Sequence, residues 1–179
     1  IHLRATNGFS GGYKKSHSGV FCSVISGDAL EMERDGFGDV RTHRSDLISP
    51  EEIGKTAGER AVKKLNSRKP KTGNFPVLFD ERISNSLIGH LLSAINGRAI
   101  VQGASWATKL LGKPIFPKGT SLFEDPHRVR SYGSRPFDGE GLPTLKRTII
   151  KDGQLNEWTL DLATARQLGE TSTANASRG

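Results

Sequence analysis

The residues of this sequence best suited to acid–base chemistry are carboxylates in two loops of its last third. The loops "FEDPHRV" and "RPFDGEG" carry them among prolines and glycines: Glu124, Asp125, Asp138 and Glu140. A close pair of carboxyl groups can act as general acid and general base in hydrolysis. Turn formation explains the same residues, because tight loops select Asp and Gly. We favour the turn interpretation and keep acid–base catalysis as the alternative.

The stretch "FDERISNSLIGHLLSAING" (79–97) predicts an amphipathic helix. Asp80 is its candidate N-cap, and Gly97 lies where a C-terminal stop is expected. The apolar side chains gather on one face: Ile83, Leu87, Ile88, Leu91, Leu92 and Ile95. We expect this face, including Leu87 and Leu91, to be buried in a core.

Zinc hydrolases place two histidines on one helix beside a glutamate, because the metal needs neutral imidazoles and its bound water needs a base. This helix contains only His90, so no alignment gives it a two-histidine site. His90 lies at the flank of the apolar stripe, where we expect a partly buried, hydrogen-bonded histidine rather than a ligand. The other histidines are scattered over predicted strands and loops: His2, His17, His43 and His127.

Several classes of site have no support in the sequence. Cys22 is the only cysteine, so it cannot form an internal disulfide or join a cysteine-based metal site. The nucleotide-binding glycine motifs and the G-x-S-x-G nucleophile turn do not occur. No apolar run approaches the length of a membrane span, and a cytoplasmic location is the default expectation. The first residue is Ile1 and not Met, which suggests a piece of a longer protein.

The remaining elements mix strands and helices. Strands are predicted at 19–26, at 29–42 and at 75–79, the second half-buried through Leu30 and Met32 and the third buried. The glycines of "NGFSGGY" (7–13) favour a turn, and Asp152-Gly153 predicts a hairpin between two strands.

A helix is predicted from Ser49 as N-cap and Pro50 at the first helical position. Its apolar stripe is spaced by four residues: Ile53, Ala57, Ala61 and Leu65. Two shorter helices are predicted over "ASWATKLLG" (104–112) and "ATARQLG", the latter ending at Gly169.

These elements predict an α+β fold of mixed or antiparallel strands with several packed helices, as a fragment of a larger two-domain protein. We divide the chain into a β-rich segment (1–48), a helical segment with one short strand (49–112), and a hairpin-containing segment with a closing helix (113–179). The three segments are expected to form one continuous unit of the longer protein.

The formal net charge of +7 and a pI near 9.8 would attract polyanions such as nucleic acid. The densest basic run, "VKKLNSRKPKTG" (62–73), has no interleaved aromatic residues and matches no nucleic-acid-binding motif. A solvated helix end and loop is the favoured interpretation. We therefore expect no specific nucleic-acid site, and a polyanion- or DNA-associated regulatory protein stays an alternative.

Blocks along nearly the whole chain resemble the TldD/PmbA family, in particular its PmbA (TldE) branch, also called modulator of DNA gyrase. The blocks occur in the family's order: "NGFSGGY", "MERDG", "TGNFPVLFD", "SLIGHLLSAINGRAI", "FEDPHRVRSYGSRPFDGEGLPTLKRTIIKDG" and "TARQLGETSTANASRG". The resemblance implies a bacterial-type protein that pairs with a TldD subunit, or with itself, as a peptidase acting on unfolded peptides. The family is also linked to microcin precursor maturation and antitoxin turnover.

The resemblance also implies what this chain lacks. In the TldD subunit the equivalent helix resembles an H-E-x-x-x-H zinc motif. The three defining positions of that motif fall on Ile88, Gly89 and Ser93 in this sequence. None of these can bind zinc or act as a base, and Cys22 is not the counterpart of the family's cysteine ligand, which is expected further downstream. Zinc is then expected only in a TldD partner, and this chain is expected to be non-catalytic alone. An autonomous non-zinc hydrolase using Asp138, Glu140 and a histidine is the remaining alternative.

Overall fold

A computed structural model, which describes residues 1–177, divides the chain into two units. Unit 1 combines residues 1–13, 77–129 and those from 133 onward, and unit 2 combines residues 14–76 with 130–132. Each unit therefore draws on more than one of the three sequence segments proposed above, and that division stays a prediction. The predicted α+β class is confirmed, because small antiparallel sheets pack with four α-helices.

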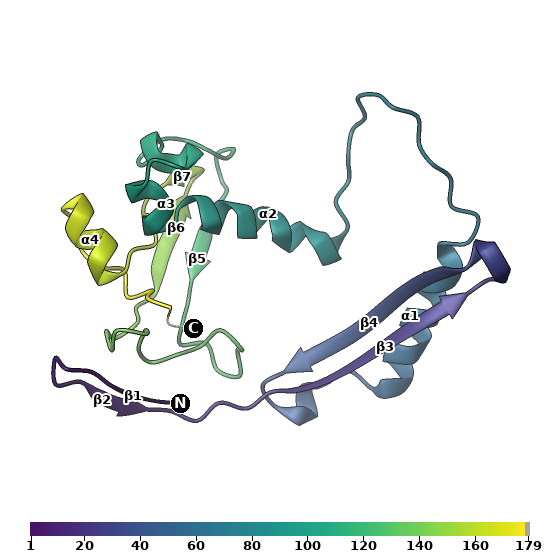
Figure 1. Cartoon of the computed structure of the whole chain (residues 1–179), viewed down its shortest axis with the longest axis horizontal. Helices are drawn as coiled ribbons and strands as arrows, with labels where there is room; N and C mark the ends of the chain where they lie inside the picture. The colour runs from purple at the N-terminus through teal and green to yellow at the C-terminus, as the bar shows by residue number, and fades with distance from the viewer. Residues whose placement is uncertain (178–179) are drawn as a thin grey trace. The chain divides into compact units, whose positions relative to one another are not determined.

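Unit 2 is a long hairpin covered by one helix. Strand β3 (Ser18–Ser26) pairs antiparallel with β4 (Glu33–Arg41), and α1 (Pro50–Lys63) packs against both (Figure 1). Helix α1 begins as predicted, since the Ser49 side chain accepts a hydrogen bond from the backbone N–H of Glu52. The predicted stripe is also confirmed, because three of its side chains are fully buried: Ile53, Ala57 and Ala61.

The strand predicted from residue 29 was placed too early. Residues 27–32 connect the two strands, with a left-handed backbone at Gly27 and a 3₁₀ turn at Ala29–Glu31. Leu30 is fully exposed and Met32 is 58% exposed, so neither is half-buried in a sheet. The alternation of these two residues with charged neighbours therefore does not mark a strand, because both lie in the connection between β3 and β4.

Unit 1 contains two small sheets and three helices. Strands β1 (His2–Arg4) and β2 (Ser10–Gly12) form a hairpin, and its turn contains Gly8 at φ +92°. The second sheet has the order β5-β6-β7, all antiparallel. Its strands and the helices of the unit have these bounds: β5 Leu122–Glu124, β6 Arg147–Lys151, β7 Gln154–Leu155, α2 Glu81–Ala94, α3 Gly97–Val101 and α4 Leu162–Leu168.

Two local predictions in unit 1 are confirmed by backbone geometry. Asp152 and Gly153 both have positive φ, at 48° and 82°, which is the conformation of a two-residue hairpin turn between β6 and β7. Helix α4 begins with a capping box at Asp161 and ends at Gly169 in the left-handed conformation.

The core of unit 1 lies where the C-terminal half of α2 meets the sheet, and Figure 1 shows α2 crossing β5 and β6. Leu91, Ala94 and Ile95 are buried there in one cluster with residues of β6 and β7. The N-terminal half of α2 extends past this cluster, because Ile83 is 54% exposed and Leu87 is 48% exposed. The prediction that Leu87 faces a core is therefore wrong for the described chain.

Gly97 does not end α2 as predicted. Helix α2 ends at Ala94, and the side chain of Asn96 then caps the start of α3. The glycine is required by packing instead, since a Cβ at position 97 would lie 2.5 Å from Oγ1 of Thr164 and 2.8 Å from a methyl carbon of Leu160. Helix α3 can thus approach α4 closely only with glycine at this position.

Two further predicted elements do not form. Residues 75–79 are not a strand, and their apolar side chains are exposed: Phe75, Val77, Leu78 and Phe79. The stretch 104–112 contains only a 3₁₀ turn, at Trp106–Lys109. No helix within residues 1–177 has both the length and the apolar character that crossing a bilayer requires.

Replacing Leu91 by alanine should destabilise the protein far more than replacing Leu87. Leu91 is 3% exposed, so Leu91→Ala leaves a core cavity and should lower the free energy of unfolding by about 2–5 kcal/mol. Leu87→Ala, at a half-exposed site on the same helix, should cost less than about 1 kcal/mol. Urea unfolding followed by circular dichroism measures both values, and equal losses would contradict this account of the helix.

Candidate functional site

A groove of about 540 Å³ runs between α2 and the sheet of unit 1. We call it the α2 groove. The side chains of Ile88, Leu92 and Ser93 line it from the helix, and residues of β5 and β6 line it from the sheet. Two of the three zinc-motif positions inferred from the sequence, 88 and 93, therefore face this groove. The third, Gly89, does not line it, and a Cβ built there would meet nothing within 4 Å.

The floor of the α2 groove carries a buried charge network. Arg147 on β6, with 8% of its side chain exposed, forms ion pairs with Glu124 on β5 and with Glu157. Its guanidinium also donates to the carbonyl of Trp158 at 3.0 Å and to Oγ1 of Thr159 at 2.8 Å. The donors of this cation are thus engaged within the protein, as burial of a charge requires.

The Glu124 carboxylate accepts hydrogen bonds from two further residues. The side-chain amide of Asn175 donates to both carboxylate oxygens, at 2.9 and 3.1 Å, and Nη2 of Arg135 lies 3.4 Å from Oε1. Sequence reasoning singled out Glu124 but gave no indication of these partners, which are 11 and 51 residues away in the chain. Glu124 therefore serves as the counter-ion of Arg147, with both carboxylate oxygens hydrogen-bonded within the protein.

The residues at the groove do not fit a zinc ion. A catalytic zinc needs three protein ligands of the nitrogen, sulfur or carboxylate type, whereas the helix offers an alkyl chain at Ile88, a hydrogen at Gly89 and a hydroxyl at Ser93. In residues 1–177 no group of three or more His, Cys, Asp or Glu side chains lies close enough together to hold a metal. Cys22, which belongs to unit 2, is half-buried and free.

The histidines do not gather at the groove. His90 is exposed on α2 and does not line the groove, so the expected partial burial is wrong. His17 and His43 belong to unit 2, while His2 and His127 belong to unit 1. The ring of His127 lies 3.1 Å from Oγ1 of Thr144, away from Asp138 and Glu140 in its contacts.

Asp138 and Glu140 hold loops together. Asp138 is 2% exposed: its Oδ1 accepts the backbone N–H groups of Glu140 and Leu142, both at 2.9 Å, and its Oδ2 accepts that of Ala176 at 3.0 Å. Oε2 of Glu140 accepts the N–H of Leu162, the first residue of α4. The two carboxylates share one turn, but their contacts point to structural tasks and not to an acid–base pair.

Asp125 is also unsuited to donating a proton near neutral pH. The backbone N–H of His127 donates to its carboxylate, and Lys146 lies 3.3 Å away. Both contacts favour the ionised form, the backbone hydrogen bond most strongly, and hold the pKa of Asp125 below its usual value.

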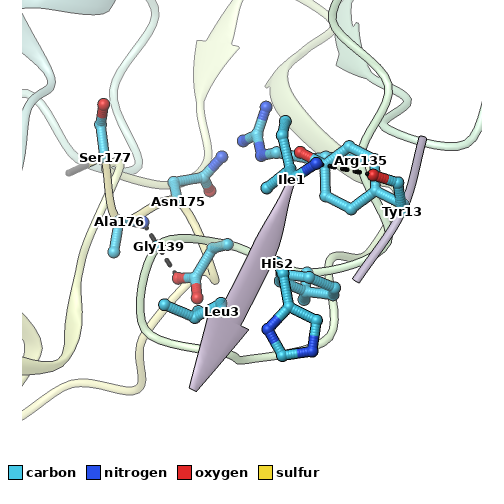
Figure 2. Close-up of a pocket in the computed structure, with 11 residues that line it drawn as sticks. Ile1, His2, Leu3, Tyr13, Arg135, Gly139, Asn175, Ala176 and Ser177 are labelled. Atoms are coloured by element: carbon cyan, nitrogen blue, oxygen red, sulfur yellow. Dashed lines mark hydrogen bonds between the residues drawn. The ribbon is translucent and has the colours of Figure 1, made fainter. Parts of the chain in front are cut away.

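A second pocket, of about 410 Å³, lies between the β1–β2 hairpin, the loop that carries Asp138 and the C-terminal segment (Figure 2). We call it the hairpin pocket. Tyr13, Arg135 and Asn175 line it, together with Phe137, whose ring lies edge-on to that of Tyr13 at 5.3 Å. None of these four residues could be singled out from the sequence, because isolated Tyr, Arg, Asn and Phe residues in loops form no motif with a recognisable spacing.

Family models match almost all of the chain. The PmbA/TldA metallopeptidase central domain matches residues 1–65, and the PmbA/TldA metallopeptidase C-terminal domain matches residues 72–179. The chain belongs to the PmbA/TldD metallopeptidase family. The resemblance inferred from the sequence blocks is thereby confirmed.

Two curated relatives illustrate the match. The metalloprotease PmbA of Escherichia coli O157:H7 is 36% identical over 171 residues, which are 96% of this chain and 38% of the relative. A metalloprotease TldD homolog of Buchnera aphidicola is 30% identical over 128 residues, 69% of this chain and 26% of the relative. The chain thus spans about two fifths of the PmbA protein, and relatives named for PmbA and for TldD both align to it.

Solved structures show the same fold. A candidate modulator of DNA gyrase from Bacteroides thetaiotaomicron superposes with a TM-score of 0.87 at 29% identity, covering 96% of this chain and 40% of the other. TldE from Thermococcus kodakarensis superposes with a TM-score of 0.73 at 20% identity, covering 99% and 40%. The second similarity concerns the fold alone.

Removing the Asp138 carboxylate should destabilise unit 1. Asp138→Ala leaves three backbone N–H groups without their acceptor, and the free energy of unfolding should fall by about 1–3 kcal/mol or more. Asp138→Asn keeps one carbonyl oxygen for Glu140 and Leu142, so its loss should be smaller. Chemical denaturation of the two variants gives the order directly. Wild-type stability in Asp138→Ala would show that the carboxylate is free for another task.

Proposed function

We propose that this chain is part of a PmbA/TldE-like component of a TldD/TldE-type peptidase complex, and that it supplies structure and not the metal. One observation carries the proposal. Helix α2 keeps its Asp80 cap, a buried C-terminal end at Leu91 and Ala94, and its place beside the groove, while positions 88, 89 and 93 hold Ile, Gly and Ser. A scaffold maintained around a position without ligands favours a non-catalytic partner over an independent metallopeptidase.

The shared fold supports a TldD-like partner. A homolog named for TldD and a metalloprotease named PmbA both align to this chain. Two subunits of one fold can associate about an approximate two-fold axis, as self-association also would. The exposed apolar residues on the N-terminal half of α2, Ile83 and Leu87, offer contact area of the kind that such association buries.

The proposed substrate is an extended or unfolded peptide. Strand β5 is an edge strand that pairs only with β6 among the described residues, so its outer backbone groups can accept another strand. The α2 groove lies directly beside β5. Precursor maturation and antitoxin turnover, which the family resemblance implies, would both present such peptides. Because no membrane segment or disulfide is required, we place the protein in the cytoplasm.

The alternatives receive less support. An autonomous hydrolase would need Asp138 and Glu140 for acid–base chemistry, and both carboxylates accept backbone hydrogen bonds instead. A polyanion-binding regulator would use the basic run 62–73, where Lys64 already pairs with Asp35. We keep nucleic-acid binding as the less favoured alternative.

The proposal is tested by peptide cleavage with and without the partner. The full-length protein, purified alone, should not cut an unfolded reporter peptide, because it supplies no metal ligands at α2. Adding the TldD-like subunit of the same organism should produce cleavage that EDTA abolishes. The variant His90→Ala, at an exposed position of α2 outside the groove, should leave cleavage by the complex within about twofold of wild type, since this histidine is expected not to be a metal ligand.

Two results would overturn the proposal. Cleavage by the protein alone that EDTA does not affect would identify an autonomous hydrolase. A failure of the two proteins to co-purify, or to act together, would remove the complex from the account.

A further inference from the structure

The walls of the hairpin pocket are fixed by contacts within the protein. Asp138 ties the loop to the C-terminal segment through the N–H of Ala176, and Figure 2 shows this bond at one side of the pocket. The N–H of Gly139 also donates to the carbonyl of Ala176 at 2.8 Å. Phe137 fixes the opposite side, with its ring edge-on to those of Phe9 at 4.9 Å and Tyr13 at 5.3 Å. These contacts order the parts of the wall that Phe137, Asp138 and Ala176 form.

The polar groups of the pocket favour a carboxylate. Arg135 has 31% of its side chain exposed, and its two hydrogen bonds, to Glu124 and to the carbonyl of Gly133, are both 3.4 Å long. These contacts are at the limit of hydrogen bonding, so the planar guanidinium keeps donors for a better acceptor. Asp138 contributes the opposing charge, but its oxygens already accept three backbone N–H bonds.

The apolar wall of the pocket indicates what the rest of the ligand would be, and the position of Asn175 limits its polar contacts. The rings of Tyr13 and Phe137 give an apolar wall that suits an aromatic or branched side chain. The amide of Asn175 donates from Nδ2 to Glu124, which leaves its Oδ1 buried and without a hydrogen-bond partner among the described residues. Because this atom has almost no accessible surface, the contacts that the pocket offers a ligand are those of Arg135 and the two rings.

We propose that the hairpin pocket binds the C-terminal residue of a peptide. The α-carboxylate pairs with Arg135, and the terminal side chain lies against Tyr13 and Phe137. Backbone and carboxylate capture of this type fixes one end of a chain without reading its sequence. The inference rests on the proposed function for its choice of a peptide, and it assigns to this subunit the recognition of a chain end.

The test compares two peptides that differ only at the C-terminus. The probes are N-acetylated Ala-Ala-Ala-Phe as the free acid and as the C-terminal amide, titrated by calorimetry into the full-length protein without its partner. We expect the amide to bind about tenfold more weakly or worse, because it lacks the charge for Arg135. Equal affinity of the two peptides, or binding of neither, overturns the proposal.

Variants locate the site. Arg135→Gln should abolish the difference between acid and amide, and Arg135→Lys should retain part of it because the charge remains. Arg98→Gln, at an exposed arginine on α3 outside the pocket, is the matched control and should leave the difference intact. An undiminished preference for the acid in folded Arg135→Gln places the site elsewhere and sinks the assignment. If Arg135→Gln does not fold, Arg135→Lys and the wild-type comparison still decide.

The outcome separates this inference from the proposed function. Calorimetry is done on one protein, whereas the complex is tested by cleavage with the TldD-like subunit. Preference for the free acid without a functional complex would leave the pocket assignment standing and remove the peptidase role. A functional complex without that preference would do the opposite.

Discussion

The guanidinium of Arg147 joins three segments of unit 1 at one point. It ties β6 to β5 through Glu124 and reaches the 157–159 segment through Glu157, Trp158 and Thr159. A cation with 8% side-chain exposure is tolerated only when such partners replace water. These contacts consequently order the floor of the α2 groove, where the Glu124 carboxylate pairs with Arg147.

One carboxylate links the two sites described here. Glu124 lines the α2 groove, while its partners Arg135 and Asn175 line the hairpin pocket. The groove and the pocket therefore lie on two sides of the same network. This network of ion pairs and hydrogen bonds holds β5, β6 and the 157–159 segment together beside the α2 groove. Asp138 also has a structural role, because its carboxylate accepts hydrogen bonds from backbone N–H groups, although its loop suggested acid–base chemistry in the sequence.

Local patterns could be predicted from the sequence where one physical cause dominates. Ser49 and Asp80 cap helices because their side chains satisfy free backbone N–H groups, and Asp152-Gly153 makes a hairpin because both positions need positive φ. The predictions for 75–79 and Leu87 failed because an apolar residue shows a preference for burial but not which surface covers it. Gly97 was misjudged for a similar reason, since its close neighbour Thr164 is 67 residues away in the chain and no local pattern shows such a contact.

The candidate sites also differ in how much of each could be predicted from the sequence. The sequence alone shows that Ile88 and Gly89 have no donor atoms at the inferred motif positions, and the absence of a bound metal stays a prediction. The hairpin pocket could not be predicted from the sequence, since Tyr13, Arg135 and Asn175 come from three distant stretches that only tertiary structure brings together. The position of Glu124 in the sequence likewise gave no sign of Arg147.

The central claim is that the metal-binding helix of this family persists here without its ligands. Elemental analysis of the full-length protein, purified without its partner and dialysed against a weak chelator, tests this most directly. The account predicts zinc far below one atom per chain, with zinc appearing only when a TldD-like subunit is present. One tightly held zinc per chain in the protein alone would contradict it.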